Sequence, residues 1–192
     1  MTVAAPGAAG FLDRDGVLIH DVNHLCRVEQ IEVLAGVAEA LRLFRDAGFK
    51  LVVVTNQSVV ARGALSEAGL SAIHMALSEK LAAEDASYDA IYYCPHHPTE
   101  GVGAYKIACT CRKPNPGMIE RAARELGLNP ACSYVVGDHT SDMELAAAVG
   151  AQGVLIREGI SIDRDNGGDA VPAFGDLLQA ARWIVTQPGQ TD

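Results

Sequence analysis

Four aspartates follow short apolar segments of the chain, where a buried strand gives way to polar residues. Asp13 and Asp15 follow one such segment, Asp138 follows another, and Asp142 comes one helical turn later. A single aspartate in such a place more often caps a helix or faces solvent. Carboxylates gathered without a cation, however, repel one another and raise each other's pKa. Because a hard cation relieves this repulsion, Asp13, Asp15 and Asp138 together predict a Mg²⁺ site with open coordination positions.

A second set of residues could bind an anion. Thr55 and Asn56 follow the apolar run that ends at Val54 and can donate hydrogen bonds to phosphate oxygens. Arg112 and Lys113 stand just before a predicted helix N-terminus, which itself favours negative charge. The guanidinium can hold oxygens in a bidentate manner, and the lysine can neutralise charge on a phosphoryl group. Such pairs also occur as turn residues or as solvated surface cations.

Cysteine and histidine form two close pairs around a glycine-containing segment. Cys94 and His96 make the first pair, and Cys109 and Cys111 the second. Three thiolates and one imidazole match a closed tetrahedral Zn²⁺ site without an open position for chemistry. His97 is an alternative to His96. An odd total of five cysteines and no secretion signal argue against a disulfide framework.

The elements that must position these residues alternate between strand and helix. The apolar patterns predict strands near residues 10–12, 51–54, 91–93, 134–136 and 154–156, and helices over 36–47, 66–81, 116–127, 141–149 and 174–185, with Asn115 as a cap and 161–170 as a loop. This alternation of strands and helices is typical of an α/β fold with a doubly wound, mostly parallel sheet. In such sheets ligands bind beyond the carboxyl ends of the strands, where the residues above are found.

The length, net charge and apolar segments of the chain indicate its domain organisation and its kinds of partner. The 192 residues fit a single domain over 1–192, with residues 94–111 as a zinc-binding loop inside it. The net charge of −9 argues against non-specific nucleic-acid binding. No window approaches the ~20 apolar residues of a membrane span, and the first ten residues do not read as a signal peptide. We therefore expect a cytoplasmic monomer with a small-molecule partner, no nucleic acid and no membrane.

Five blocks carry a family resemblance. They are Asp13-Arg14-Asp15-Gly16-Val17, Thr55-Asn56-Gln57-Ser58, Cys94-Pro95-His96-His97-Pro98, Cys111-Arg112-Lys113-Pro114 and Gly137-Asp138. In this order they resemble the haloacid dehalogenase superfamily, specifically its heptose bisphosphate and histidinol phosphate phosphatase branch. The resemblance covers residues 11 to about 156. It implies a Rossmann-like fold. The stretches from Gly16 to Val54 and from Cys94 to Cys111 are too short for a separate cap domain, so we expect none.

The resemblance also implies roles for the matching residues. Asp13 would be the nucleophile and Asp15 the general acid and base. Magnesium would be held by the Asp13 carboxylate, the Asp15 main-chain carbonyl and Asp138. The substrate-binding residues would be Thr55, Asn56, Gln57, Ser58, Arg112 and Lys113, and the zinc ligands Cys94, His96, Cys109 and Cys111.

The resemblance further implies a substrate. The run from Thr55 to Ser58, continuing to Ala61-Arg62-Gly63, is closer to the heptose enzymes. It implies hydrolysis of D-glycero-D-manno-heptose 1,7-bisphosphate at position 7, in nucleotide-activated heptose biosynthesis. Three positions depart from the family pattern: Val17, Val59 and His139 stand where threonine, glycine and lysine are usual.

Other functions remain compatible with parts of the pattern. The nearest enzyme alternative is a histidinol phosphate phosphatase or another small phosphosugar phosphatase. A relative that removes phosphates from DNA ends fits poorly with the negative charge. A receiver-like signalling domain also uses a strand-end aspartate and Mg²⁺, but it needs neither the Cys–His loop nor Asp15. A zinc-stabilised binding module without turnover is the remaining alternative.

Overall fold

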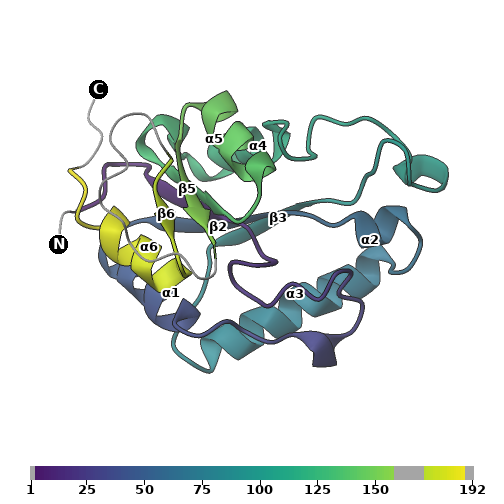
Figure 1. The fold of residues 1–192 in the computed structure, drawn as a ribbon, viewed down its shortest axis with the longest axis horizontal. Coiled ribbons are helices and arrows are strands. Elements are labelled where there is room, and N and C mark those ends of the chain that lie inside the picture. The colour runs from purple at the N-terminus through teal and green to yellow at the C-terminus, as the bar shows by residue number, and fades with distance from the viewer. Residues whose placement is uncertain (1–2, 158–170, 189–192) are drawn as a thin grey trace.

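Within the described part of the chain, six parallel strands form one sheet in the order β3-β2-β1-β4-β5-β6 (Figure 1). This computed structural model describes residues 3–157 and 171–188, so the loop predicted at 161–170 lies outside the described residues. The strands are β1 (Ala9–Leu12), β2 (Lys50–Asn56), β3 (Ala90–Cys94), β4 (Tyr134–Gly137), β5 (Gln152–Ile156) and β6 (Ala173–Phe174). The helices are α1 (Val37–Asp46), α2 (Ser58–Ala61), α3 (Glu67–Ala82), α4 (Gly117–Leu126), α5 (Thr140–Val149) and α6 (Leu177–Ile184), with 3₁₀ turns at Val28–Gln30, Gly103–Tyr105 and Pro130–Cys132.

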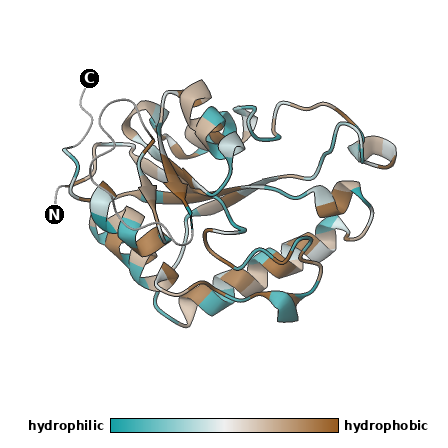
Figure 2. Ribbon diagram, in the orientation of Figure 1, coloured by the Kyte–Doolittle hydropathy of each residue, from teal (hydrophilic) through white to brown (hydrophobic). Residues whose placement is uncertain are grey.

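Helices cover both faces of the sheet, because successive residues of each strand point to opposite sides. Leu12 of β1 belongs to the core that the sheet shares with α1, α3 and α6. Phe11, its neighbour, lies in the core under α4 and α5. Both side chains are fully buried, and the strands are mainly brown in Figure 2, as expected for a sheet apolar on both faces. The predicted doubly wound fold is confirmed.

The central position of β1 brings the site residues together. Leu12 is in register with Val53 of β2 on one side and with Val136 of β4 on the other. The polar residues that follow these three strands therefore emerge side by side at one edge of the sheet. The strand order reverses beside β1, which is where sheets of this kind leave a crevice for ligands.

Two local predictions were wrong, and one short helix was missed. The last helix begins at Leu177, not at 174, because Phe174 pairs with β5 and Asp176 caps the helix through the main-chain N–H of Gln179 (2.7 Å). Helix α4 begins at Gly117, and Asn115 does not cap it, since its amide donates to the Cys109 carbonyl (2.7 Å). The short helix α2 was not predicted.

Neither long connection folds into a separate cap domain within the described residues. The segment after β1 consists of a loop and one 3₁₀ turn before α1, and the segment after β3 forms the Cys–His loop. Among the helices of residues 3–157 and 171–188, none has the length and hydropathy that a membrane crossing requires.

Candidate active site and metal centres

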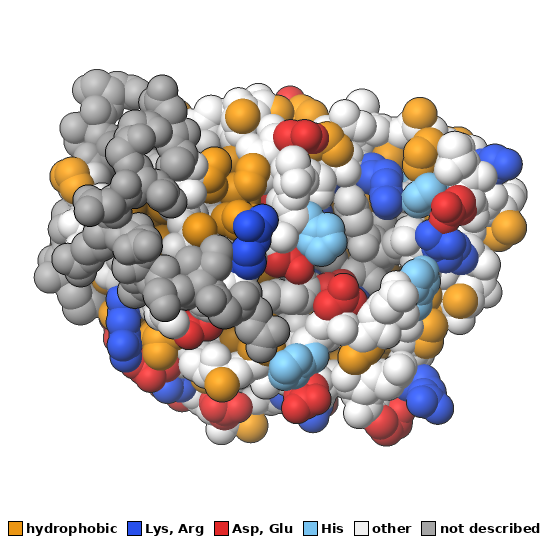
Figure 3. Space-filling model, viewed as in Figure 1, with side chains coloured by type: hydrophobic (Ala, Val, Ile, Leu, Met, Phe, Trp, Pro, Cys, Tyr) orange, Lys and Arg blue, Asp and Glu red, His pale blue; other side chains and the backbone are white. Residues whose placement is uncertain are grey.

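A pocket of about 330 Å³ opens where β1, β2 and β4 end. In Figure 3, acidic and histidine side chains lie around the middle of this face. The pocket is lined by Asp13, Arg14, Asp15, Asp21, Asn23, His24, Leu25, Thr55, Asn56, Gln57, Ser58, Val59, Arg112, Lys113, Asp138, His139 and Ser141. All the residues predicted to act in catalysis, substrate binding or magnesium binding are therefore brought together.

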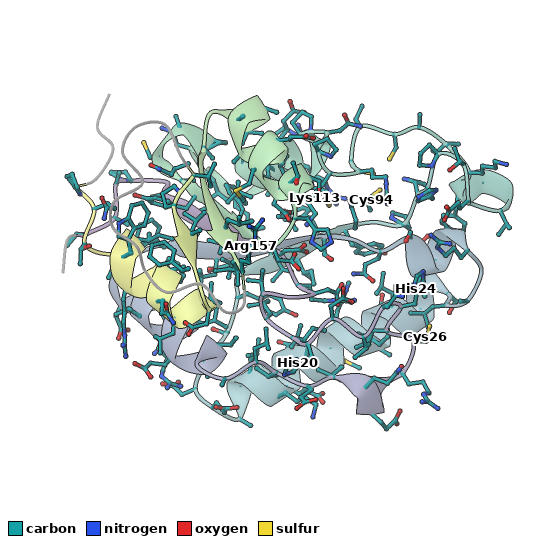
Figure 4. The ribbon with its side chains drawn as sticks, in the orientation of Figure 1. His20, His24, Cys26, Cys94, Lys113 and Arg157 are labelled. Atoms are coloured by element: carbon teal, nitrogen blue, oxygen red, sulfur yellow. The ribbon has the colours of Figure 1, made fainter. Side chains whose placement is uncertain are left out.

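Lys113, labelled in Figure 4, is a buried cation in the wall of the pocket. Its Nζ lies 2.8 Å from Asp13 Oδ2 and 2.7 Å from Asp142 Oδ1, and it donates to the Val54 carbonyl at 3.1 Å. Burial acts to lower the pKa of Lys113, but the charges of Asp13 and Asp142 outweigh it and hold the pKa above its ordinary value. The lysine is therefore charged at neutral pH and holds the Asp13 carboxylate in one orientation.

Asp138 and Asp142 crowd the same space as Asp13. Burial raises the pKa of Asp138, and the charge of Asp13 raises it further, against an opposing effect of His139. Burial likewise raises the pKa of Asp142, although Lys113 opposes it. One lysine thus leaves this group of carboxylates under-neutralised. Such a set of oxygen donors fits a hard divalent cation such as Mg²⁺.

Gly16 brings the turn after β1 close to Asp138. Its φ is +75°, and a Cβ at this position would lie 2.2 Å from Asp138 Oδ2. Only glycine combines this backbone conformation with so close an approach. The turn that carries Asp13 and Asp15 is therefore pressed against the third predicted magnesium ligand, which supports the fit of this cluster to a cation.

Asp15 is held by two side chains. The Arg14 guanidinium donates from Nη2 to both Asp15 oxygens at 3.0 Å and from Nε to Oδ1 at 3.2 Å. Gln57 Nε2 donates to Asp15 Oδ2 at 2.8 Å and to Thr55 Oγ1 at 2.9 Å. The Asp15 side chain remains 26% exposed, so its carboxylate can still meet a molecule in the pocket.

Asn56 connects the end of β2 to the backbone of Lys113. Its Oδ1 accepts from the Lys113 main-chain N–H (3.0 Å), and its Nδ2 donates to the Lys113 carbonyl (3.2 Å). In this arrangement both groups of the Asn56 amide are engaged by protein. Arg112 Nη1 donates to the His96 carbonyl at 3.2 Å while the residue lines the pocket.

The predicted zinc ligands meet in one cluster. Cys111 Sγ lies 3.2 Å from Cys94 Sγ and 3.3 Å from Cys109 Sγ, and Cys94 and Cys109 are 3.5 Å apart. His96 Nδ1 lies 3.4 Å from Cys111 Sγ and 3.8 Å from Cys94 Sγ. Zinc–sulfur bonds of about 2.3 Å in a tetrahedron place ligand atoms about 3.8 Å apart, so the cluster fits Zn²⁺. His97 Nδ1 instead accepts from the Glu100 N–H at 2.9 Å.

Comparisons with known proteins agree with this geometry. The family model for HAD-hydrolase-like proteins matches residues 110–174. The D-glycero-beta-D-manno-heptose-1,7-bisphosphate 7-phosphatase of Escherichia coli (strain CFT073) is 42% identical over 177 residues, which are 90% of this chain and 93% of that protein. The chain belongs to the heptose bisphosphate phosphatase family.

Two solved structures of related proteins have the same fold as this chain. The D,D-heptose 1,7-bisphosphate phosphatase of B. bronchiseptica, complexed with magnesium and phosphate, has a TM-score of 0.77 at 31% identity, covering 96% of this chain and 98% of that one. A HAD-like protein from Mesorhizobium loti has a TM-score of 0.84 at 30% identity, covering 100% and 92%.

The structure shows where the three residues that depart from the family pattern lie. Val17 and Val59 are buried at 1% and 3% exposure. Val17 packs in the core that contains Leu12, whereas Val59 also lines the pocket. His139 Nδ1 lies 2.8 Å from Asp138 Oδ1. The His139 imidazole therefore contacts a residue that is predicted to bind magnesium.

Sequence reasoning missed some residues of the site. Ser141 lines the pocket from the first turn of α5, and its place directly after the strand-end residues could have indicated this. Arg14 was read only as part of a motif, although its contact to Asp15 orders the site. His74 of α3 touches Arg14 and gave no signal in the sequence, because it stands next to the apolar stripe of a helix.

Proposed function

We propose that this protein removes the 7-phosphate of D-glycero-β-D-manno-heptose 1,7-bisphosphate, as a step in the biosynthesis of nucleotide-activated heptose. The observation that carries the proposal is the 42% identity, over 90% of the chain, with enzymes of that activity. The pocket supports it, because it gathers carboxylates and fixed cations at the carboxyl ends of three parallel strands. Phosphate ester hydrolysis needs this combination of a nucleophile and electrostatic stabilisation.

Asp13 would act as the nucleophile. Its Oδ1 accepts from the Arg14 main-chain N–H at 2.7 Å and its Oδ2 contacts Lys113, so the carboxylate is oriented before substrate arrives. An Asp13 oxygen would attack phosphorus in line as the bond to the sugar oxygen breaks, forming an aspartyl-phosphate. Lys113 and the Thr55 hydroxyl would stabilise charge on the phosphoryl oxygens.

Asp15 would move the protons of both steps. It would first protonate the departing sugar oxygen, and then, as a carboxylate, take a proton from the water that cleaves the aspartyl-phosphate. The Asp13 carboxylate, the Asp15 carbonyl and Asp138 would hold Mg²⁺, which would supply positive charge to offset that of the phosphoryl group. The substrate-binding set would be completed by Gln57, Ser58 and Arg112 along the pocket wall, with Asn56 fixing the Lys113 backbone.

Zinc would have a structural role in the loop over residues 94–111. Cys94, His96, Cys109 and Cys111 supply four donors, which leaves no position for substrate in a tetrahedral site. Cys111 stands two residues before Lys113, so a fixed metal cluster would also fix the start of the phosphate-binding segment. The loop would thus stabilise the fold near the pocket without taking part in the reaction.

The test is phosphate release by the purified protein with Mg²⁺. Both anomers of the heptose bisphosphate, fructose 1,6-bisphosphate and histidinol phosphate serve as substrates, and kcat/KM should be highest for the β anomer. Asp13→Asn should abolish turnover while the exposed Asp46→Asn behaves as wild type, which controls for the loss of a carboxylate. A higher kcat/KM for histidinol phosphate would overturn the substrate assignment, and activity of Asp13→Asn would overturn its role.

A further inference from the structure

Arg14 is a fully buried cation in the wall of the pocket, with 1% of its surface exposed. One edge of its guanidinium, Nε and Nη2, holds the Asp15 carboxylate. The remaining nitrogen, Nη1, lies 3.3 Å from Nε2 of His74. Because the guanidinium is planar and rigid, contacts on two sides fix its rotation as well as its position.

His74 reaches this position from helix α3, outside the pocket. It is 6% exposed, and its ring lies 5.5 Å from the Tyr93 ring. Its main-chain carbonyl accepts from the Tyr88 hydroxyl at 3.1 Å, which ties that turn of α3 to the segment before β3. The imidazole therefore belongs to the rigid core and not to a mobile loop.

The direction of the His74–Arg14 contact follows from its chemistry. An arginine has only donors, so His74 Nε2 must be the acceptor and the ring proton sits on Nδ1. Burial, with a further effect from the Arg14 charge, lowers the pKa of His74 to about 4. The neutral ring is the form that can accept, and it is the form present at neutral pH.

We propose that His74 is a positioning residue for the reaction: it orients Arg14, and through Arg14 it sets the direction of the Asp15 carboxylate. The inference rests on the proposed role of Asp15 as general acid. Gln57 holds only one Asp15 oxygen, Oδ2, whereas Arg14 contacts both. Loss of the His74 acceptor would therefore let the guanidinium turn and carry Asp15 with it.

Three variants separate this role from simple core packing. His74→Leu fills the space but removes the acceptor, and His74→Gln offers an amide oxygen near the place of Nε2. Tyr88→Phe is the matched control, because it removes the hydroxyl that donates to the His74 carbonyl and leaves both partners of the contact between His74 Nε2 and Arg14 Nη1 in place. Single-turnover rates are measured with the heptose bisphosphate, whose alkoxide needs a proton to leave, and with p-nitrophenyl phosphate, whose phenolate needs little.

The ratio of the two rates reports on the general acid. A well-placed acid contributes ~10²–10⁴-fold, so we expect His74→Leu to lower the sugar-to-aryl ratio by about 10-fold. His74→Gln and Tyr88→Phe should keep the ratio close to that of wild type. An unchanged ratio in His74→Leu, or an equal fall in Tyr88→Phe, would overturn the proposal, since a packing defect slows both substrates alike.

A measurement without turnover keeps the inference separate from the proposed function. In NMR spectra the Arg14 Nε–H should exchange slowly with water in wild type and His74→Gln, and quickly in His74→Leu. Equal exchange in all three would refute the link between His74 and Arg14, whatever the activity. Wild-type protein that is inactive on both phosphates would overturn the proposed function, while the exchange data would still decide whether His74 holds Arg14.

Discussion

Replacing Lys113 by methionine removes the positive charge that lies between Asp13 and Asp142. The lysine is 5% exposed and has three partners, the Asp13 and Asp142 carboxylates and the Val54 carbonyl. Methionine has a similar length but no donor. All three acceptors lose a partner, and the two carboxylates, themselves 9% and 1% exposed, are left to repel each other.

The expected loss of stability is large for one substitution. Removing one partner of a buried ion pair costs about 3–5 kcal/mol, because the remaining charge stays buried without compensation. For a protein of this size, each kcal/mol lowers the Tm by about 2–4 °C, so the Tm should fall by roughly 6–20 °C. Removing a carboxylate as well should restore stability: the coupling between Lys113→Met and Asp142→Asn should be about 1–3 kcal/mol.

Urea denaturation followed by circular dichroism at pH 7 measures these differences, with an unchanged m value as evidence for the same unfolding reaction. Lys50→Met is the matched control. Lys50 Nζ also lies 2.7 Å from a carboxylate, that of Asp89, but on the surface, so its loss should leave the midpoint almost unchanged. If Lys113→Met costs no more than Lys50→Met, or if the double variant is as unstable as the summed single variants, the reasoning about the buried charges is wrong.

Further predictions concern pH, the magnesium site and zinc. His74 has a lower pKa in the folded protein (about 4) than its ordinary 6.5, so the unfolded chain binds more protons and stability should fall as the pH drops from 6.5 to 4. This contribution is about 3 kcal/mol, and urea titrations should show it absent in His74→Gln. Gly16→Ala should abolish Mg²⁺ binding in calorimetry, because its Cβ would collide with Asp138 Oδ2, and normal binding would refute this. Cys109→Ser should lower both the zinc content, measured by elemental analysis, and the Tm; an unchanged Tm would contradict a structural zinc.

The sequence was a good guide wherever local pattern and chain order decide the structure. The apolar run over 51–54 became a strand buried on both faces, and Ser66 caps α3 through the Gly69 N–H (3.0 Å) as its type indicates. The sequence also predicted that Asp13 and Asp138 lie near each other, because parallel strands present their carboxyl ends at the same edge of a sheet, and both residues line the pocket.

The features that could not be predicted from the sequence depend on contacts between residues that are far apart in the chain. Ala173–Phe174 is a strand because it pairs with β5. Two residues are too few to show the residue pattern from which a strand is predicted. The role of Arg14 depends on His74, sixty residues later in the chain. Likewise, nothing near Asn56 indicates that its amide would bind the backbone of Lys113.

The central place of β1 in the sheet also sets a time order for synthesis of the protein. Gly10 pairs with Leu51 on one side and with Tyr134 on the other, so one edge of β1 has no partner until most of the chain exists. A ribosome adding ~5–20 residues per second needs on the order of ten seconds to pass from the end of β2 to the end of β4. During this interval the nascent chain exposes an open parallel edge, which other chains can pair with. The pocket can close only afterwards, because Asp138 follows the strand that completes the pairing.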